Sequence, residues 1–193
     1  MIMRMSRLAI LPMMMMASAT MADWTLAPES RLTFQSTKNI HKTETHYFSS
    51  VDGTVKSNGS TTLTIDLASV QTGIPIRDER MQKHLFATSK FTSAVLQSSV
   101  PRSVMKKLSA GQTQTFDLSG SITLHGKRVA IKTPVMAVPA KDGSIVVASL
   151  SPLMLDARKF ELNAGVDKLQ EIAKLQNIGY NVPVNFTLVF KAQ

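Results

Sequence analysis

Cysteine is absent from this chain of 193 residues. Its absence excludes a disulfide scaffold, a cysteine-bound zinc site, an iron–sulfur cluster and a thiol nucleophile. Only four histidines are left to build a metal site or an acid–base site. The composition therefore favours a binding domain over a metalloenzyme, and we expect neither a metal ion nor a cofactor.

Motifs of catalysis are also missing. The sequence contains no G-x-S-x-G, no H-E-x-x-H and no phosphate-binding loop. His41 and His46 are five residues apart on one expected strand, so they should point to opposite faces and cannot share a metal ion. For His84, at the expected end of a helix, and His125, at an expected turn, structural or solvent roles are favoured. We therefore expect a protein that is not an enzyme.

Aromatic residues are few, with one tryptophan and two tyrosines. An outer-membrane barrel needs aromatic girdles, so their shortage disfavours that class. The formal net charge is +9. This charge is consistent with a plain solvated surface or with attraction to anionic lipid head groups and phosphates. Nucleic acid is not expected as a partner, because no aromatic–basic motif of a nucleic-acid module is present.

Residues 1–22 have the pattern of a cleaved secretory signal peptide. Two arginines give a positive start, an apolar run follows, and small residues precede the expected cleavage site after Ala22 or Ala19. The run is too short for a transmembrane helix, which needs about 20 apolar residues. We expect one mature domain over residues 23–193, and the lack of disulfides in an exported domain indicates a periplasmic location.

Alternation of polar and apolar residues dominates the rest of the chain. It is clearest over residues 62–67, 116–124 and 182–190, and each run predicts a half-buried strand with one apolar face. Further strands are expected over 128–137 and 145–155. Turns are expected at Asp52-Gly53, Asn58-Gly59, His125-Gly126 and Asp142-Gly143. Many strands joined by tight turns predict an all-β fold with a closed or sandwiched antiparallel sheet.

Two segments break this alternation and predict short helices. Residues 77–86 have acidic side chains first and basic ones last, which suits the helix dipole. Residues 166–178 have apolar residues at helical spacing, and Gly179 is the expected stop. Residues 106–114 are expected to form a mobile loop.

A group of cations lies on the first expected helix and just after it. Its members are Arg77, Arg80, Lys83, His84 and Lys90. If this helix covers one end of a barrel, then Arg77, Arg80 and Lys83 would stand near the opening and could bind the head group of a ligand. A solvated helix face is the alternative interpretation.

Three parts of the chain carry a resemblance to a known family. They are a first strand that starts with tryptophan, a strand followed by an arginine–aspartate helix, and a closing helix and strand. Their residues are 24–34, 65–73 with 76–81 and 85–86, and 163–166 with 182–186. In these parts the chain resembles the YceI-like family of exported proteins that bind lipids or polyisoprenoids. The resemblance implies an extended, lipocalin-like antiparallel β-barrel of about eight strands with two short helices and an apolar cavity.

The resemblance also implies a ligand, namely a long amphipathic lipid such as an isoprenoid, a quinone or a fatty-acid derivative. The cavity candidates are apolar residues of the expected strands, namely Phe34, Ile65, Phe116, Ile122, Val184, Phe186 and Leu188. Each CH₂ group withdrawn from water contributes about 0.8 kcal/mol, so a long chain can bind tightly without polar contacts.

The expected function is that of a periplasmic carrier or scavenger of such a lipid. An enzyme acting on a lipid inside the same barrel is the alternative. The positive charge allows a transient contact with an anionic membrane surface. The sequence leaves the oligomeric state open.

Overall fold

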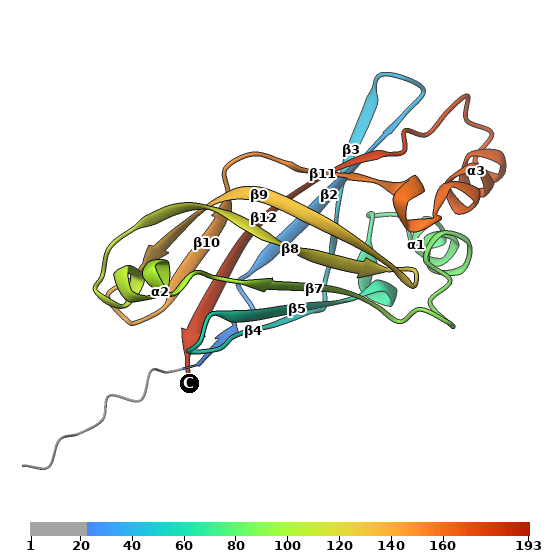
Figure 1. Cartoon of the computed structure of the whole chain (residues 1–193). Coiled ribbons are helices and arrows are strands. Elements are labelled where there is room, and N and C mark those ends of the chain that lie inside the picture. The colour runs from blue at the N-terminus through green and yellow to red at the C-terminus, as the bar shows by residue number, and fades with distance from the viewer. Residues whose placement is uncertain (1–22) are drawn as a thin grey trace, which may run out of the picture.

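The computed structural model describes residues 23–193. It shows a closed eight-stranded antiparallel β-barrel with extra strand segments and three short α-helices (Figure 1). The barrel expected from the sequence is thus confirmed, although there is one α-helix more than the two expected. The expected signal peptide, residues 1–22, lies outside the described residues.

Strand segments make up most of the described chain. The strands are β1 (Trp24–Leu26), β2 (Arg31–Lys38), β3 (Lys42–Phe48), β4 (Val51–Val55), β5 (Ser60–Asp66), β6 (Val70–Gln71), β7 (Ser93–Ser99), β8 (Gln114–Leu124), β9 (Lys127–Pro139), β10 (Ile145–Ser149), β11 (Leu153–Asp156) and β12 (Asn181–Ala192). The α-helices are α1 (Pro75–Arg80), α2 (Arg102–Ser109) and α3 (Asn163–Ile172). Two 3-10 helices, η1 (Leu67–Ser69) and η3 (Ala157–Phe160), and one π-helix, η2 (Met81–Phe86), complete the helical segments.

The strand segments outnumber the eight barrel positions because some positions are shared by two segments. Both β1 and β2 pair with β12. The next position is shared by β4, which pairs with β1, and by β3, which pairs with β2. The position after that is shared by β5, which pairs with β4, and by β6, which pairs with β3. On the other side of β12, β10 and β11 share one position. Strands β7, β8 and β9 complete the ring.

The last strand, β12, closes the barrel because it pairs along both of its edges. Phe190 lies opposite Leu26 of β1 on one edge and opposite Ile145 of β10 on the other. Val184 lies between Phe34 of β2 and the start of β11. This double pairing closes the ring, while β11 and β6 each pair with one strand only, β12 and β3 respectively.

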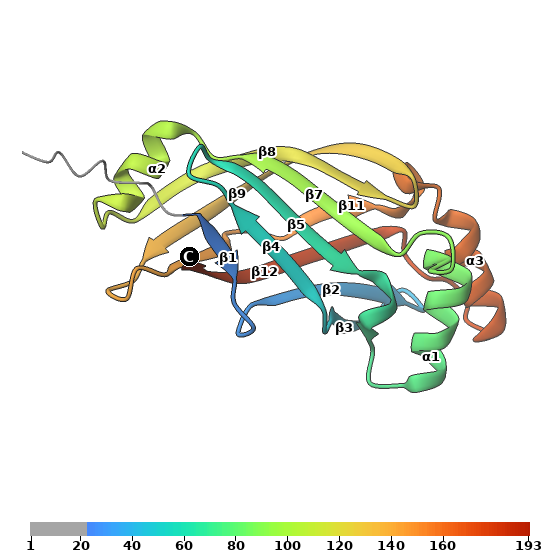
Figure 2. The same ribbon diagram turned by 90° about the horizontal axis from the view of Figure 1, so that it is seen from below.

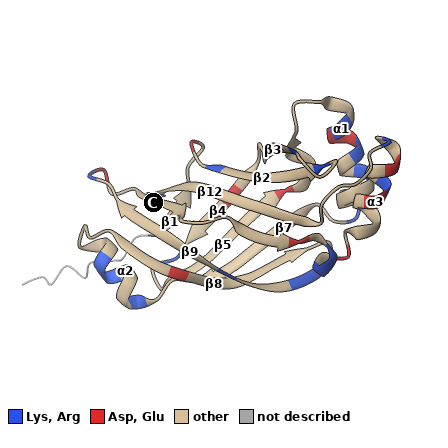
Figure 3. Ribbon diagram, turned by 90° about the horizontal axis from the view of Figure 1, so that it is seen from above, with Lys and Arg blue, Asp and Glu red and all other residues tan. Residues whose placement is uncertain are grey.

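The helices lie at the two ends of the barrel (Figures 1 and 2). Helices α1 and α3 gather with η2 at one end, and α2 lies at the other end, between β7 and β8. Helices at both ends carry Lys and Arg residues, coloured blue on the ribbon (Figure 3). The strands therefore form the wall of the barrel, and the longer connections cover its ends.

The first expected helix is present, in two parts. Pro75 occupies the first turn of α1, where a missing N–H group needs no partner. At Met81 the α-helix gives way to the π-helix η2, and Ala87 ends it with a φ of 49° in the left-handed region. π-Helical turns are rare and occur often at functional sites.

Helix α2 replaces part of a segment expected to be a loop. The expectation of a mobile loop over residues 106–114 was wrong for its first part, because α2 extends to Ser109. Met105 and Leu108 are buried, whereas Lys106 and Lys107 are exposed. A helix of eight residues is too short for its apolar spacing to repeat. Only the structure reveals α2, because the packing of its apolar residues against the end of the barrel is what distinguishes it from a loop.

The second expected helix lies nearer the N-terminus than its pattern indicated. Helix α3 ends at Ile172, and Lys174 just after it has a positive φ of 52°. The expected range of 166–178 was therefore wrong at both ends. Gly179 does not stop the helix, and its backbone N–H donates to the carbonyl of Thr37 in β2 at 2.8 Å. The segment after α3 is thus tied to the β2–β3 hairpin.

Two strand boundaries also differ from the expected ones. Asp52-Gly53 lies inside β4 and not in a turn. A Cβ atom at residue 53 would meet Cδ1 of Leu63 at 2.9 Å, so Gly53 permits close packing of the strands. The single strand expected over 145–155 is divided into β10 and β11. Pro152 lies between them, and proline cannot donate a hydrogen bond to a sheet.

Gly165 determines how closely α3 approaches η2. A Cβ atom at this position would meet the carbonyl oxygen of His84 at 2.6 Å and Cα of Leu85 at 2.9 Å. Helix propensity alone would make Gly165→Ala stabilising by about 1 kcal/mol. The close contact predicts the opposite sign, a loss of roughly 1–3 kcal/mol of unfolding free energy through overpacking. Urea denaturation measures this difference.

The control is Ala164→Ser at the neighbouring exposed position. It should change the free energy of unfolding by less than about 0.5 kcal/mol. A Gly165→Ala variant more stable than the wild type would show that α3 does not pack this closely on η2.

Candidate ligand cavity and its polar end

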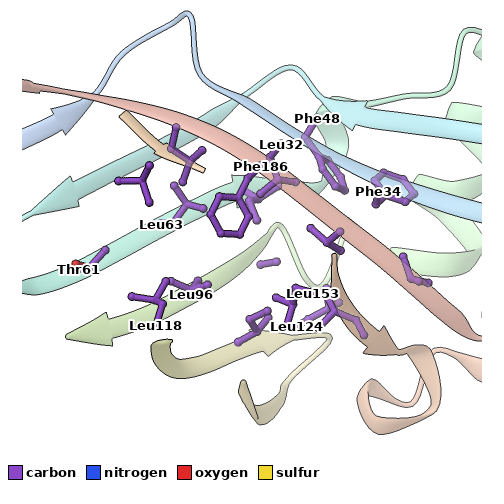
Figure 4. Close-up of a pocket in the computed structure, with 18 of the residues that line it drawn as sticks. Leu32, Phe34, Phe48, Thr61, Leu63, Leu96, Leu118, Leu124, Leu153 and Phe186 are labelled. Carbon is purple, nitrogen blue, oxygen red and sulfur yellow. The ribbon is translucent and has the colours of Figure 1, made fainter. Parts of the chain in front are cut away.

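The barrel encloses an apolar cavity of about 220 Å³. Of the 34 residues that line it, all except Thr61 are aliphatic, aromatic or methionine. They come from every strand except β6 and from helical segments at both ends of the barrel. Figure 4 shows Leu63, Leu118 and Phe186 reaching into this space from three different strands. The lining offers extensive apolar contact and almost no hydrogen-bonding groups.

The size of the cavity limits what it can hold. A cavity needs only roughly 10–15 Å³ of such volume to hold one water molecule. A cavity of about 220 Å³ is therefore far larger than one water molecule needs, and it suits an extended apolar group such as a lipid chain.

The residues predicted as cavity candidates all line this cavity. They are Phe34, Ile65, Phe116, Ile122, Val184, Phe186 and Leu188. Their common face follows from the alternation of side chains along a strand. That they contact a ligand stays a prediction.

The sequence analysis missed lining residues outside the alternating strand patterns. They are Trp24 of β1, Leu85 and Phe86 of η2, and Met105 and Leu108 of α2. The spacing of three between Met105 and Leu108 is a helical signal, but one pair is too little to identify a helix.

Three phenylalanines from different elements meet at one end of the cavity. The ring centroids of Phe34 and Phe48 lie 5.2 Å apart in a stacked arrangement, and those of Phe48 and Phe86 lie 6.0 Å apart. Phe34 and Phe48 lie near one another in Figure 4. On its other side Phe34 meets the ring of His46, at a centroid distance of 5.2 Å. The apolar lining of β2 and β3 ends at these rings.

Beyond the rings, the inward faces of β2 and β3 become polar. The residues two and four positions after Phe34, and two and four positions before Phe48, continue the same faces. One residue of α1 joins them. We call these five residues the inner polar cluster, namely Ser36, Lys38, Glu44, His46 and Arg77.

Glu44 is at the centre of this inner polar cluster. Its Oε2 atom accepts hydrogen bonds from Nζ of Lys38 and from Nη1 of Arg77, each at 2.7 Å. Nη2 of Arg77 also donates to the carbonyl of Thr72 at 2.6 Å. The hydrogen bond from Lys38, and then that from Arg77, hold the pKa of Glu44 below its ordinary value. These bonds tie α1 to the strand β3.

His46 is the most deeply buried member, with 2 % of its surface exposed. Its Nε2 atom lies 2.9 Å from Oγ of Ser36, within hydrogen-bond distance. Burial of the ring, and then the nearby charge of Arg77, lower the pKa of His46. The imidazole is therefore neutral at neutral pH.

The predicted head-group residues are not equivalent in the structure. Arg77 has protein partners in the inner polar cluster. Arg80 is half-buried and Lys83 is exposed, and neither lines the cavity. Helix α1 does lie at one end of the barrel, as that prediction required (Figure 1). Binding of a head group by these three cations stays a prediction.

The other histidines lie outside the inner polar cluster, and no described histidine lines the cavity. His41 is exposed and precedes β3, so the expectation that it shares a strand with His46 was wrong. His125 lies in the β8–β9 turn, as expected, with Nδ1 3.3 Å from the carbonyl oxygen of Phe160. Its ring packs on Phe91 at a centroid distance of 4.4 Å, which is a structural contact.

Comparison with known proteins gives a consistent result. A family model described as a YceI-like domain matches residues 24–190. A solved polyisoprenoid-binding domain from Saccharophagus degradans, implicated in plant cell wall breakdown, is 34 % identical, with a TM-score of 0.85. The match covers 90 % of this chain and 100 % of that one. A comparison with curated proteins found no match.

Two more distant structures share the fold. Burkholderia cenocepacia BcnA is 22 % identical with a TM-score of 0.65, over 83 % of this chain and 96 % of that one. A YCEI protein from Campylobacter jejuni is 14 % identical with a TM-score of 0.54, over 77 % of this chain and 84 % of that one. At these identities the likeness concerns the barrel alone.

Among residues 23–193, no helix has both the length and the apolar character that crossing a membrane requires. Within the same residues, no three or more His, Asp or Glu side chains are grouped so that they could hold a metal ion.

The lowered pKa of His46 predicts that the fold weakens on acidification. Between pH 6.5 and pH 5 the unfolded chain, whose histidine pKa is about 6.5, binds more protons than the folded chain. The contribution of His46 to stability is present above this range and is lost as the pH falls. The melting temperature should therefore drop between pH 7.5 and pH 5, and less so in His46→Leu.

Nearby charges also shift the pKa of His46, and with it the pH range in which stability is lost. Arg77 and Lys38 favour the neutral ring, whereas Glu44 and Asp78 favour the charged one. Thr45→Leu, on the outward face next to His46, is the matched control and should keep the wild-type pH dependence. An unchanged dependence in His46→Leu would show that His46 does not titrate as a buried group.

Proposed function

Because the chain belongs to the YceI-like family, we propose that it binds one long-chain amphipathic lipid, with the lipid chain in the barrel cavity. The observation that carries this proposal is the apolar cavity of about 220 Å³ inside a closed barrel. Each CH₂ group withdrawn from water contributes about 0.8 kcal/mol, so a long hydrocarbon chain binds strongly without polar contacts. An isoprenoid, a quinone tail and a fatty-acid derivative all meet this description.

The similarity to a polyisoprenoid-binding domain supports the same ligand class. A shape-adaptable hydrocarbon suits a lining of leucine, valine and phenylalanine side chains better than a rigid polar compound does. We propose that ligand choice within this class depends on chain length and on the polar head.

The proposed biological role is that of an exported carrier or scavenger of this lipid in the periplasm. The signal-peptide pattern of residues 1–22 supports export. Without the two arginines of that segment the chain keeps 20 basic against 13 acidic side chains, and this positive charge suits a transient contact with an anionic membrane surface. N-terminal sequencing of the protein from a periplasmic fraction would test export. The alternative from the sequence, an enzyme acting on a lipid in the same barrel, stays a prediction.

Lipid binding is tested by native mass spectrometry of the purified protein, followed by organic extraction. We expect a bound species whose mass, after extraction, corresponds to one long hydrocarbon chain with a polar head group. Trp24 is the chain's single tryptophan and lines the cavity, so its fluorescence should change when the delipidated protein takes up lipid. A delipidated protein that takes up no long-chain lipid would overturn the proposal.

Val184→Trp tests whether the inward face of β12 meets ligand or a filled core. Val184 is 9 % exposed and lines the cavity. In a filled core the indole would destabilise the fold by roughly 1–3 kcal/mol. In a ligand cavity it can occupy the space of the lipid, so we expect a small change in melting temperature and a loss of at least about tenfold in lipid affinity, since the indole displaces several CH₂ groups.

Thr187→Trp is the matched control, on the exposed outward face of the same strand. It should leave uptake of a fluorescent long-chain lipid nearly unchanged. If Val184→Trp binds lipid with wild-type affinity, or if it is strongly destabilised, Val184 does not line a ligand site.

A further inference from the structure

We infer that the lipid enters and leaves the cavity through the side of the barrel, between β9 and β11, and that the outer rim of this opening contacts the membrane that supplies the lipid. The inference rests on the proposed lipid binding and specifies the route to the same cavity. The opening is a groove between residues 129–132 of β9 and residues 153–156 of β11, which we call the lateral groove.

Strand pairing is missing along the lateral groove. Strand β10 pairs with β9 only over residues 135–139 of β9, and β11 pairs only with β12. The last hydrogen bond between β9 and the segment after β10 runs from the N–H of Leu150 to the carbonyl oxygen of Pro134, at 3.0 Å. Within the described chain, no backbone hydrogen bond joins β9 to β11. These two strands can therefore move apart without breaking a ladder, unlike β8 and β9, which are paired along their length.

Two prolines explain why the pairing ends here. Pro134 accepts a hydrogen bond from Leu150 but has no N–H to return the second bond of an antiparallel pair. Pro152 separates β10 from β11. Because the backbone groups of a strand alternate between its two sides, Ala130 and Lys132 turn theirs to the same side as Pro134, toward the groove. The unpaired edge of β9 therefore follows from the sequence.

The far end of the lateral groove is closed by contacts near η3. Nζ of Lys127 lies 2.6 Å from Oε1 of Glu161, which directly follows η3. Nδ1 of His125 lies 3.3 Å from the carbonyl oxygen of Phe160. Between these contacts and the hydrogen bond of Leu150, the groove has a volume of about 180 Å³. The opening is thus limited to one place in the wall.

Three apolar side chains lie between the lateral groove and the cavity. Leu153, Leu155 and Phe160 line both spaces. Passage through the groove therefore needs a rearrangement of these side chains, and a lipid chain replaces their apolar contacts with its own. At the ends of the barrel, η2 and α3 on one side and α2 on the other line the cavity, so passage there needs movement of whole helices. Side chains rotate faster than helices move.

The outer rim of the groove is apolar to an unusual degree. Leu150 is 50 % exposed and Met154 is 58 % exposed. They are two of only five large apolar side chains that the described chain exposes. Leu150 stands where the pairing with β9 ends, and Met154 lines the groove itself. Exposed apolar side chains beside an opening to an apolar cavity suit contact with acyl chains.

Basic side chains accompany these apolar ones. Lys132 and Lys159 line the groove and are exposed. Among the described residues Lys159 has no ion pair, and the groove's single acidic residue, Asp156, is bonded to Arg158 at 2.9 Å. Apolar residues next to lysines are typical of surfaces that lie at the boundary between acyl chains and anionic head groups. The charge of the rim thus favours an anionic bilayer as the partner of this surface.

A covalent link across the groove tests the route. The chain has no cysteine, so Ala130→Cys with Met154→Cys places its only two thiols on the two sides of the groove. The shortest bis-maleimide that joins them, verified by mass, holds β9 and β11 together. Uptake of a fluorescent long-chain lipid from anionic vesicles should be at least about tenfold slower than in the same variant capped with N-ethylmaleimide, because the opening step is blocked. The amount of lipid bound at equilibrium should not change.

The matched control keeps the same cysteine at residue 130. Ser121→Cys lies opposite Ala130 on β8, where the strands are already paired, so a link between these two positions should leave the uptake rate unchanged. If the link across the groove leaves the rate at that of the capped protein, or if both links slow uptake equally, the lipid does not enter between β9 and β11.

Met154→Glu tests contact of the rim with a membrane. A carboxylate in place of this apolar side chain should slow transfer from anionic vesicles by about fivefold or more, through repulsion and lost apolar contact. Uptake of the same lipid from a cyclodextrin complex, which presents no membrane, should be unaffected. Ile40→Glu makes the same change at a side chain that is 64 % exposed at the tip of the β2–β3 hairpin, and it should transfer lipid at the wild-type rate. Equal rates for the two variants would overturn the membrane contact.

Measurements at equilibrium separate this inference from the proposed function. A wild-type protein that binds no long-chain lipid at equilibrium refutes the proposed function, and the inference fails with it. Normal binding at equilibrium together with an uptake rate that the link does not change leaves lipid binding intact and overturns the lateral route alone.

Discussion

Pairing of β12 along both edges is the constraint on which the rest of the structure depends. This strand holds β1 and β2 on one side and β10 and β11 on the other, so it joins the two ends of the chain into a ring. Once the ring is closed, every inward side chain faces the same enclosed space. Slippage of β12 by one residue would turn Val184, Phe186 and Leu188 outward, so burial itself maintains the register.

The side chains that point inward do not fill the space that the barrel encloses. A barrel of eight strands is wide enough either to be filled by its own side chains or to hold one small ligand. Here an apolar cavity of about 220 Å³ is present. By the usual relation between cavity volume and stability, such a cavity costs on the order of 5 kcal/mol when no side chain or ligand fills it. A bound lipid chain offsets this cost, so ligand binding and stability are expected to rise together.

The inward faces of β2 and β3 change from apolar to polar along their length. Phe34 and Phe48 end the apolar lining, and Ser36 and His46 begin a buried polar region directly beyond them. The polar region also anchors α1, because Arg77 bonds to Glu44 of β3 and to the backbone of Thr72. The position of helix α1 therefore depends on the inner polar cluster, which lies beyond the apolar lining of the cavity.

The sequence by itself determined the all-β fold and the inward residues of the long strands. A period of two along β5, β8 and β12 is local, and it assigned Ile65, Phe116 and Val184 to one face without knowledge of their partners. It could not show helix α2, whose two buried residues, Met105 and Leu108, are recognisable only from their packing. Nor could it show that Gly53 serves strand packing and not a turn. Only the tertiary structure brought Glu44 of β3 and Arg77 of α1 together, because their contact depends on the path of the chain around the barrel, which no local pattern records.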